Sequence, residues 1–110
     1  MKSKADKFNK QQKELAEFAK ALSHPARIAI IQLLAEKKEI KTGNISDYLP
    51  IARTTVSQHL KILKDAGIII GTIDGLKIHY CLDMEKLNDI KEKQNKFLNS
   101  VISDFISCCS

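Results

Sequence analysis

A helical repeat that runs directly into a hairpin signal leaves this chain few possible folds. Residues 52–66 place apolar side chains on one arc when each residue advances by about 100°, which predicts an amphipathic helix. Residues 68–73 are β-branched and rich in Ile, Asp74-Gly75 is a signal for a two-residue type I′ turn, and residues 76–82 supply the return strand. A β-hairpin that directly follows two helices joined by a tight turn is the arrangement of a winged helix-turn-helix.

Three further helices are predicted before the helix over residues 52–66. Residues 6–22 carry apolar side chains at a spacing of three to four, and the first half is rich in Lys. Pro25 suits the first turn of the next helix, over residues 25–36, with Ser23 or His24 near its N-cap. A short helix is expected over residues 43–49, where Ile45, Tyr48 and Leu49 face inward and Pro50 ends it.

The ends of two helices carry local stop and start signals. Gly67 is expected to end the helix over residues 52–66, because glycine accepts the left-handed backbone that follows many helices. Asp83 is expected to cap a last long helix over residues 84–107. The expected fold is therefore mostly α with a small β-hairpin wing. It is one domain over residues 1–110, with the helix-turn-helix at 43–66 and the wing at 68–82.

Composition excludes several classes of protein. The chain is 44% hydrophobic and 28% charged, which is typical of a globular domain. It has no apolar stretch of about 20 residues and no apolar core in residues 1–20, so we expect a cytoplasmic protein without a membrane span. Three Cys make no disulfide framework. A phosphate loop, a nucleophile elbow and paired metal-binding histidines are all missing, so we expect no enzyme.

The polar face of the helix over residues 52–66 carries the functional signal. Its only acid is Asp65, at the far end. Hydroxyl and amide groups there suit base edges and phosphates, Arg suits guanine or phosphate, and a helix N-terminus attracts phosphate. A net charge of +5 fits an anionic partner. The predicted DNA-contacting residues of this helix are Arg53, Thr54, Thr55, Ser57, Gln58 and Lys61. Lys64 lies further along the same polar face.

Two other residues, Lys77 and His59, lie near this face. Lys77 is predicted to lie on the wing opposite Thr72, where it reaches DNA or stays a solvated side chain. His59 lies beside the apolar arc, so a packed histidine is expected rather than a base contact.

Two motifs in order resemble one known family. Residues 21–27, Ala-Leu-Ser-His-Pro-Ala-Arg, look like the opening of the arsenical-resistance-repressor (ArsR) family. Residues 55–60, Thr-Val-Ser-Gln-His-Leu, followed by Leu63 and Ala66-Gly67, look like its recognition helix. The resemblance covers about residues 15–82 and implies a winged-helix homodimer that binds double-stranded operator DNA and blocks transcription until a signal releases it.

The resemblance also implies that the first and last helices form the dimer interface. Both carry apolar stripes that fit this role, although a four-helix packing within one chain would satisfy the same stripes. The predicted interface residues are Phe8, Leu15, Phe18, Leu87, Phe97, Val101 and Phe105.

The residues that would bind the releasing signal depart from the family pattern. The arsenic- and cadmium-type sensors carry Cys-x-Cys where this chain has Lys41 and Gly43, and no His lies beyond residue 79 to act as a zinc ligand on the last helix. Cys108 and Cys109 remain as adjacent thiols for arsenite or another soft ion, and Cys81 is the candidate third ligand. Cys81 meets that tail only if the long helices of two subunits run antiparallel.

Two alternatives stay open at this point. One is a regulator of the same family with no metal site, released by oxidation of the tail thiols or by another signal. The other is a winged helix that binds protein rather than DNA. Such a module needs no acid-free polar helix face, so the residues between Arg53 and Lys64 favour DNA.

Overall fold

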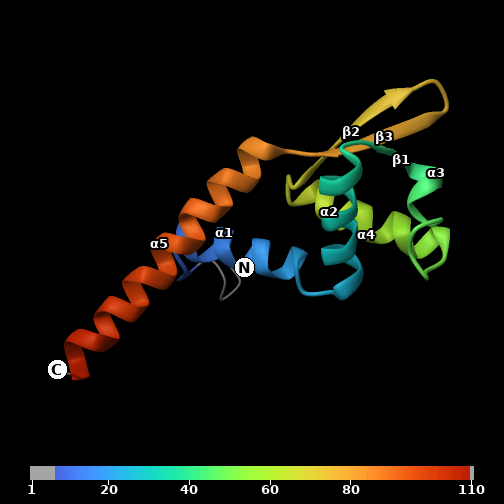
Figure 1. Cartoon of the computed structure of the whole chain (residues 1–110). Helices are drawn as coiled ribbons and strands as arrows, with labels where there is room; N and C mark the ends of the chain where they lie inside the picture. The colour runs from blue at the N-terminus through green and yellow to red at the C-terminus, as the bar shows by residue number, and fades with distance from the viewer. Residues whose placement is uncertain (1–6, 110) are drawn as a thin grey trace.

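The computed structural model describes residues 7–109, except for the side chains of residues 41–43, 108 and 109. Figure 1 shows a helical body with a hairpin at one end and a long helix that leaves it at the other. The described elements are α1 (Lys10–Ala21), α2 (Pro25–Lys37), β1 (Ile40–Lys41), α3 (Thr42–Ile45), α4 (Arg53–Asp65), β2 (Ile69–Asp74), β3 (Lys77–Leu82) and α5 (Met84–Cys109).

The N-terminal helix starts later than its periodicity predicts. Asn9 is the N-cap of α1, and its side chain and that of Gln12 form a reciprocal capping box with each other's backbone N–H groups. Phe8 therefore lies before the helix and is exposed, which corrects its placement on the helical stripe. Residue 6, the expected first helical residue, lies outside the described residues.

The second helix begins where Pro25 predicts. His24 is its N-cap, and the Nδ1 atom of His24 accepts a hydrogen bond from the backbone N–H of Ala26 at 3.0 Å. The choice between Ser23 and His24 is thereby settled. The helix runs one residue past the expected end, to Lys37.

The short helix α3 was predicted too long. After Ile45 the backbone changes to hydrogen bonds between residues three apart, from Asp47 to Asn44 and from Tyr48 to Ile45. Ile45 is buried as expected, but the Tyr48 side chain is 53% exposed, so its predicted inward position is wrong. In its outward position the Tyr48 ring has the Nζ atom of Lys37 5.2 Å from its centre, within range of a cation–π contact.

The recognition-type helix α4 ends in a Schellman motif. The N–H of Gly67 donates to the Lys64 carbonyl at 2.9 Å, and the N–H of Ile68 donates to the Leu63 carbonyl at 3.0 Å. The φ angle of Gly67 is +79°, a value that a side chain would strain. The predicted role of this glycine is confirmed, and the chain enters β2 directly from the turn.

The hairpin loop lies one residue later than predicted, which shifts the cross-strand pairing by two residues. Asp74 pairs with Lys77 and Thr72 pairs with His79, so Lys77 does not lie opposite Thr72. The two-residue loop is Gly75-Leu76, and of these only Gly75 has a positive φ, +64°. That pattern belongs to a type II′ turn, which needs glycine at its first loop position, rather than to the predicted type I′ turn.

A third strand was not predicted. Ile40 and Lys41 form β1, which pairs antiparallel with Tyr80 and His79 of β3, so the sheet order is β1-β3-β2. The side chain of His79 lies between two carboxylates, with Nδ1 against Glu39 and Nε2 3.2 Å from Asp74. His79 thus joins the segment before β1 to the hairpin.

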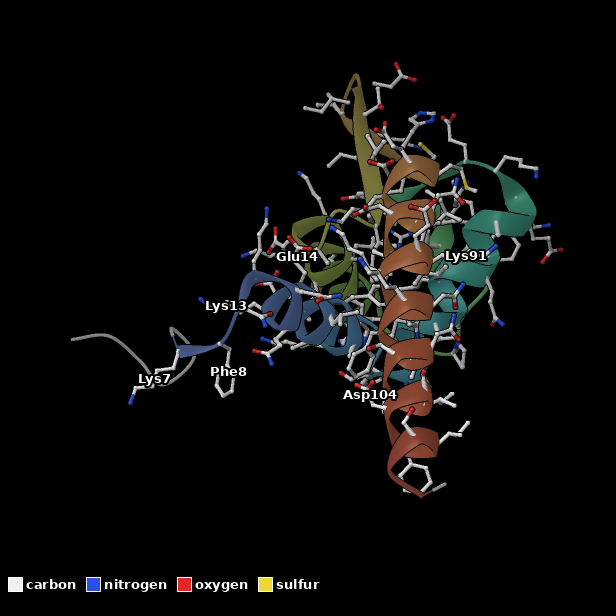
Figure 2. All side chains as sticks on the ribbon, turned by 90° about the vertical axis from the view of Figure 1, so that its left-hand side faces the viewer. Lys7, Phe8, Lys13, Glu14, Lys91 and Asp104 are labelled. Atoms are coloured by element: carbon white, nitrogen blue, oxygen red, sulfur yellow. The ribbon has the colours of Figure 1, made fainter. Side chains whose placement is uncertain are left out.

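The last helix carries the predicted cap and departs from the body. The side chain of Asp83 accepts a hydrogen bond from the N–H of Lys86 at 3.1 Å. The start of α5 packs on α1, where the Nζ atom of Lys93 lies 2.8 Å from Glu14 and 3.0 Å from Asp89. The helix stays beside α1 as far as Phe97 and Leu98, which line a pocket with Leu15, and then extends away from the other elements (Figures 1 and 2).

One apolar core holds α4 and the hairpin against the other elements. It draws on α2, α3, α4, the residues that lead into β2, and the inner face of the sheet. No described helix is long and apolar enough to cross a membrane. The largest fully buried side chains are Ile30, Leu34, Ile45, Val56, Leu60, Leu63 and Ile68.

Candidate nucleic-acid interface

The two faces of α4 are separated as its sequence predicts. Val56, Leu60 and Leu63 are buried in the core. The opposite face is open to solvent, so its side chains can approach a partner without any change in the fold. The exposed residues are Arg53, Thr54, Ser57, Gln58, Lys61 and Lys64, and Thr55 is half-buried at their edge.

The electrostatics of this face favour an anion. The first turn of α4 contains no acid, and the N-cap Ala52 offers no side chain to the helix N-terminus. The backbone N–H groups there carry the positive end of the helix dipole, and Arg53 lies beside them. Asp65 is the only acid of α4, and it lies at the other end. The arrangement suits a phosphate backbone at the start of the helix.

The hairpin provides a second projection at the same end of the molecule. In Figure 1 the tip of the hairpin and the start of α4 both point away from the free end of α5. Lys77 is exposed at the base of the loop, beside its cross-strand partner Asp74. Ile73 and Leu76 are exposed as well, so the tip is more apolar than the exposed face of α4.

A buried polar cluster lies behind the exposed face. His59 is 7% exposed, which confirms the prediction that it is packed rather than a base contact. Its Nδ1 atom lies 3.1 Å from the Nη1 atom of Arg27, and its ring centre lies 4.4 Å from that of His24. Burial lowers the pKa of His59, and the neighbouring His24 and Arg27 lower it further, in that order.

Sequence reasoning missed the part that Arg27 plays. The residue was noted as the end of a motif, without any structural role. A signal was available, because Arg27 is a charged residue directly before an apolar stretch, Ile28 to Leu34, that is broken only by Gln32. Long charged side chains are rarely buried without partners, and Arg27 is only 8% exposed.

The described part of the structure does not show the candidate metal ligands close together. Cys81 is half-buried on β3, and the side chains of Cys108 and Cys109 lie outside the described part of the chain. With 26 residues at about 1.5 Å each, α5 separates Cys81 from the tail by about 39 Å within one subunit. Within the described residues, no group of three or more His, Cys, Asp or Glu side chains is placed to hold a metal ion.

Apart from Phe8, which is exposed before α1, the predicted interface residues fall into two groups. Leu15, Phe18 and Leu87 are half-buried, and Phe18 and Leu87 pack against the core of their own chain. Phe97 is exposed but still lies beside α1, where it lines a pocket with Leu15, whereas Val101 and Phe105 are exposed on the part of α5 that extends beyond the body. Figure 2 shows this extension, in which α5 continues below the other elements near Asp104. Leu98, Ile102 and Ile106 widen the same exposed apolar stripe.

Comparisons with known proteins agree with this geometry. A family model described as "Bacterial regulatory protein, arsR family" matches residues 24–70. An uncharacterised HTH-type transcriptional regulator of Mycobacterium tuberculosis is 32% identical over 92 residues, which cover 84% of this chain and 81% of that protein. A homolog of the cadmium resistance transcriptional regulatory protein CadC of Staphylococcus aureus is 30% identical and covers 80% of this chain and 79% of its own length.

A solved structure gives the same fold. The homodimeric winged helix-turn-helix DNA-binding domain of a possible ArsR-family regulator from Mycobacterium bovis matches with a TM-score of 0.66. The match covers 94% of this chain and 88% of that domain at 22% identity, so it supports the architecture alone.

Proposed function

Because the chain belongs to the ArsR family of bacterial regulatory proteins, which are winged helix-turn-helix transcriptional regulators, we propose that its homodimer represses transcription from a specific operator. The observation that carries this proposal is the exposed face of α4, which has hydroxyl, amide and basic groups and no acid before Asp65. A dimer bound at a promoter in the cytoplasm excludes RNA polymerase from the same DNA.

Each subunit places α4 in the major groove. Arg53, Ser57 and Gln58 are the side chains best placed to reach base edges, because they are exposed in the first two turns of the helix. Thr54, Thr55 and Lys61 contact the neighbouring phosphates, and Lys77 contacts the backbone beside the wing. Two such helices related by a two-fold axis read half-sites about 34 Å apart.

Dimerisation follows from the exposed stripe on α5. A contiguous apolar surface on a helix that leaves the body favours a second copy of the chain, since water is then excluded from both stripes. The domain from Mycobacterium bovis that shares this architecture is itself homodimeric. Phe97, Val101 and Phe105 form the centre of the proposed contact.

Fluorescence anisotropy with the DNA upstream of the chain's own gene tests the proposal. Labelled DNA of that sequence is titrated with reduced protein, and a scrambled duplex of equal length and composition is the control. We expect tighter binding to the gene's own upstream DNA, with an affinity that falls steeply as salt rises. Equal, weak binding to both duplexes at low salt would contradict a sequence-specific regulator and favour a protein-binding module.

We further propose that the thiols carry the releasing signal. The adjacent Cys108 and Cys109 offer two soft ligands, and Cys81 of the partner subunit is the proposed third ligand for arsenite or another thiophilic ion. The similarity to a cadmium resistance regulator supports a response to a soft ion of this kind. An antiparallel pair of α5 helices would bring the two ends together, since a single subunit keeps them about 39 Å apart.

Replacing both tail cysteines by Ser tests this signal separately. In the anisotropy assay, arsenite is expected to release the wild-type protein from DNA and to leave the doubly substituted protein bound. Release of both proteins by arsenite would exclude the tail as the site. If an oxidant releases the wild type and arsenite does not, the releasing signal is disulfide formation rather than ion binding.

A further inference from the structure

The carboxyl end of α1 and the helix α4 are joined by one buried side chain. Arg27 lies on α2, between them, and its guanidinium group donates four hydrogen bonds. Nε donates to the Ala21 carbonyl at 2.8 Å, and Nη2 donates to the Lys20 carbonyl at 3.0 Å. Nη2 also donates to the Ser23 hydroxyl at 3.1 Å, and Nη1 donates to His59 at 3.1 Å.

The chemistry of these partners determines which atom donates and which accepts in each hydrogen bond. Guanidinium groups have no acceptor, so the Nδ1 atom of His59 must accept the bond, and His59 is the neutral tautomer with its proton on Nε2. The other three acceptors all belong to the last turn of α1 and the residue that follows its C-cap. Arg27 therefore holds α1 with one side of its planar group and α4 with the other.

Burial makes the arrangement costly to change. Arg27 is 8% exposed, and none of its hydrogen-bond partners among the described residues is a carboxylate. Among the described residues these lone pairs are what stabilises its charge, so a shift of either helix leaves a buried N–H without an acceptor. The planar fork also limits the directions from which both helices can be reached.

We propose that Arg27 is a positioning residue through which the orientation of α1 sets the orientation of α4 on DNA. The inference rests on the proposed function, since it assumes that α4 reads DNA. His59 lies next to Gln58 in the chain and faces the core, so moving His59 moves the exposed face of α4 with it.

The same chain of contacts reaches the proposed dimer helix. On the other side of α1, Glu14 is paired with Lys93 of α5 at 2.8 Å. A change in how two subunits pack along α5 thus passes to α1, then through Arg27 to His59. A signal that repacks the dimer changes DNA affinity by this route, without contacting α4 itself.

Two substitutions of His59 test the link. His59→Leu introduces an apolar side chain of similar size and removes the acceptor for Arg27, whereas His59→Gln supplies an amide oxygen that can accept the bond. Anisotropy gives the operator affinity, sedimentation gives the dimer dissociation constant, and thermal unfolding gives the stability. All DNA titrations are done at protein concentrations where each variant is dimeric.

We expect His59→Leu to bind the operator about tenfold more weakly while it still dimerises, and His59→Gln to keep most of the wild-type affinity. The third variant, Arg27→Lys, retains the charge without the fork and is expected to resemble His59→Leu. Equal affinities for the Leu and Gln variants, or a lower melting temperature with unchanged affinity, would overturn the inference. Absence of specific binding by the wild type would instead overturn the proposed function.

Discussion

The Nη1 atom of Arg27 lies 3.1 Å from the Nδ1 atom of His59, although the two residues are 32 positions apart in the chain. This bond requires a neutral imidazole, because arginine can only donate. Burial and the neighbouring His24 and Arg27 lower the pKa of His59 below 6.5 in the folded protein. Protonation of the unfolded chain therefore begins at a higher pH than protonation of the folded one.

The first prediction is that stability falls below about pH 6.5 because of His59. Above that pH both states carry a neutral imidazole, and this residue makes no pH-dependent contribution. As the pH falls from 6.5 toward the lowered pKa, the unfolded state binds more protons and is favoured. Urea unfolding of the wild type and of His59→Gln across pH 7.5 to 5 checks this. Identical pH slopes for both proteins would show that His59 is not responsible.

The second prediction concerns the exposed face of α4. Replacing Ser57 and Gln58 by Ala is expected to weaken operator binding by about tenfold or more, since each good base contact contributes about 1–3 kcal/mol. The melting temperature is expected to stay within the range of ordinary surface substitutions, because both side chains are exposed. The matched control replaces Asn99 and Ser100, an adjacent amide and hydroxyl on the exposed part of α5. A parallel loss of stability would mean that the face of α4 is assigned wrongly.

Salt dependence provides a third prediction. If Lys61 contacts phosphate in each subunit of the dimer, Lys61→Ala removes two contacts. The slope of log affinity against log salt is then expected to decrease in magnitude by about 1.8, at about 0.9 for each phosphate contact. Lys91→Ala, at an exposed position on α5, is the control and should leave the slope unchanged. A reduced slope in the control alone would place DNA on α5 instead.

The fourth prediction concerns the apolar stripe of α5. A charge at its centre, Val101→Glu, is expected to shift the protein from dimer to monomer in sedimentation, because an unpaired carboxylate in an apolar contact is strongly unfavourable. The matched control, Ser100→Glu, introduces the same charge beside the stripe. A dimer that survives Val101→Glu would mean that the exposed stripe is not the subunit contact.

Local signals account for most of the elements that were predicted correctly. Pro25, Gly67 and Asp83 each act on the backbone within a few residues, so the start of α2, the end of α4 and the start of α5 follow from the sequence. The two faces of α4 follow from its period for the same reason. The hairpin was predicted as well, although its register needed one further fact, the preference of Gly75 for the first loop position.

Features that depend on distant residues were missed. The strand β1 has two residues, and it exists because Ile40 pairs with Tyr80, far along the chain. The Tyr48 side chain lies outward beside Lys37 of another helix, α2. Neither relationship leaves a periodic pattern, since two-residue pairing and a single side-chain contact are too short to repeat.

By itself the sequence determined the winged helix-turn-helix order, the family and the polar face of α4, because periodicity, capping and turn residues act over a few positions. Only the tertiary structure decided that Arg27 joins α1 to α4, that His59 accepts its bond, and that α5 extends with an unpaired apolar stripe. These features depend on which helices meet. Burial of the apolar faces brings together groups that are far apart in the chain, and their hydrogen bonds then become obligatory.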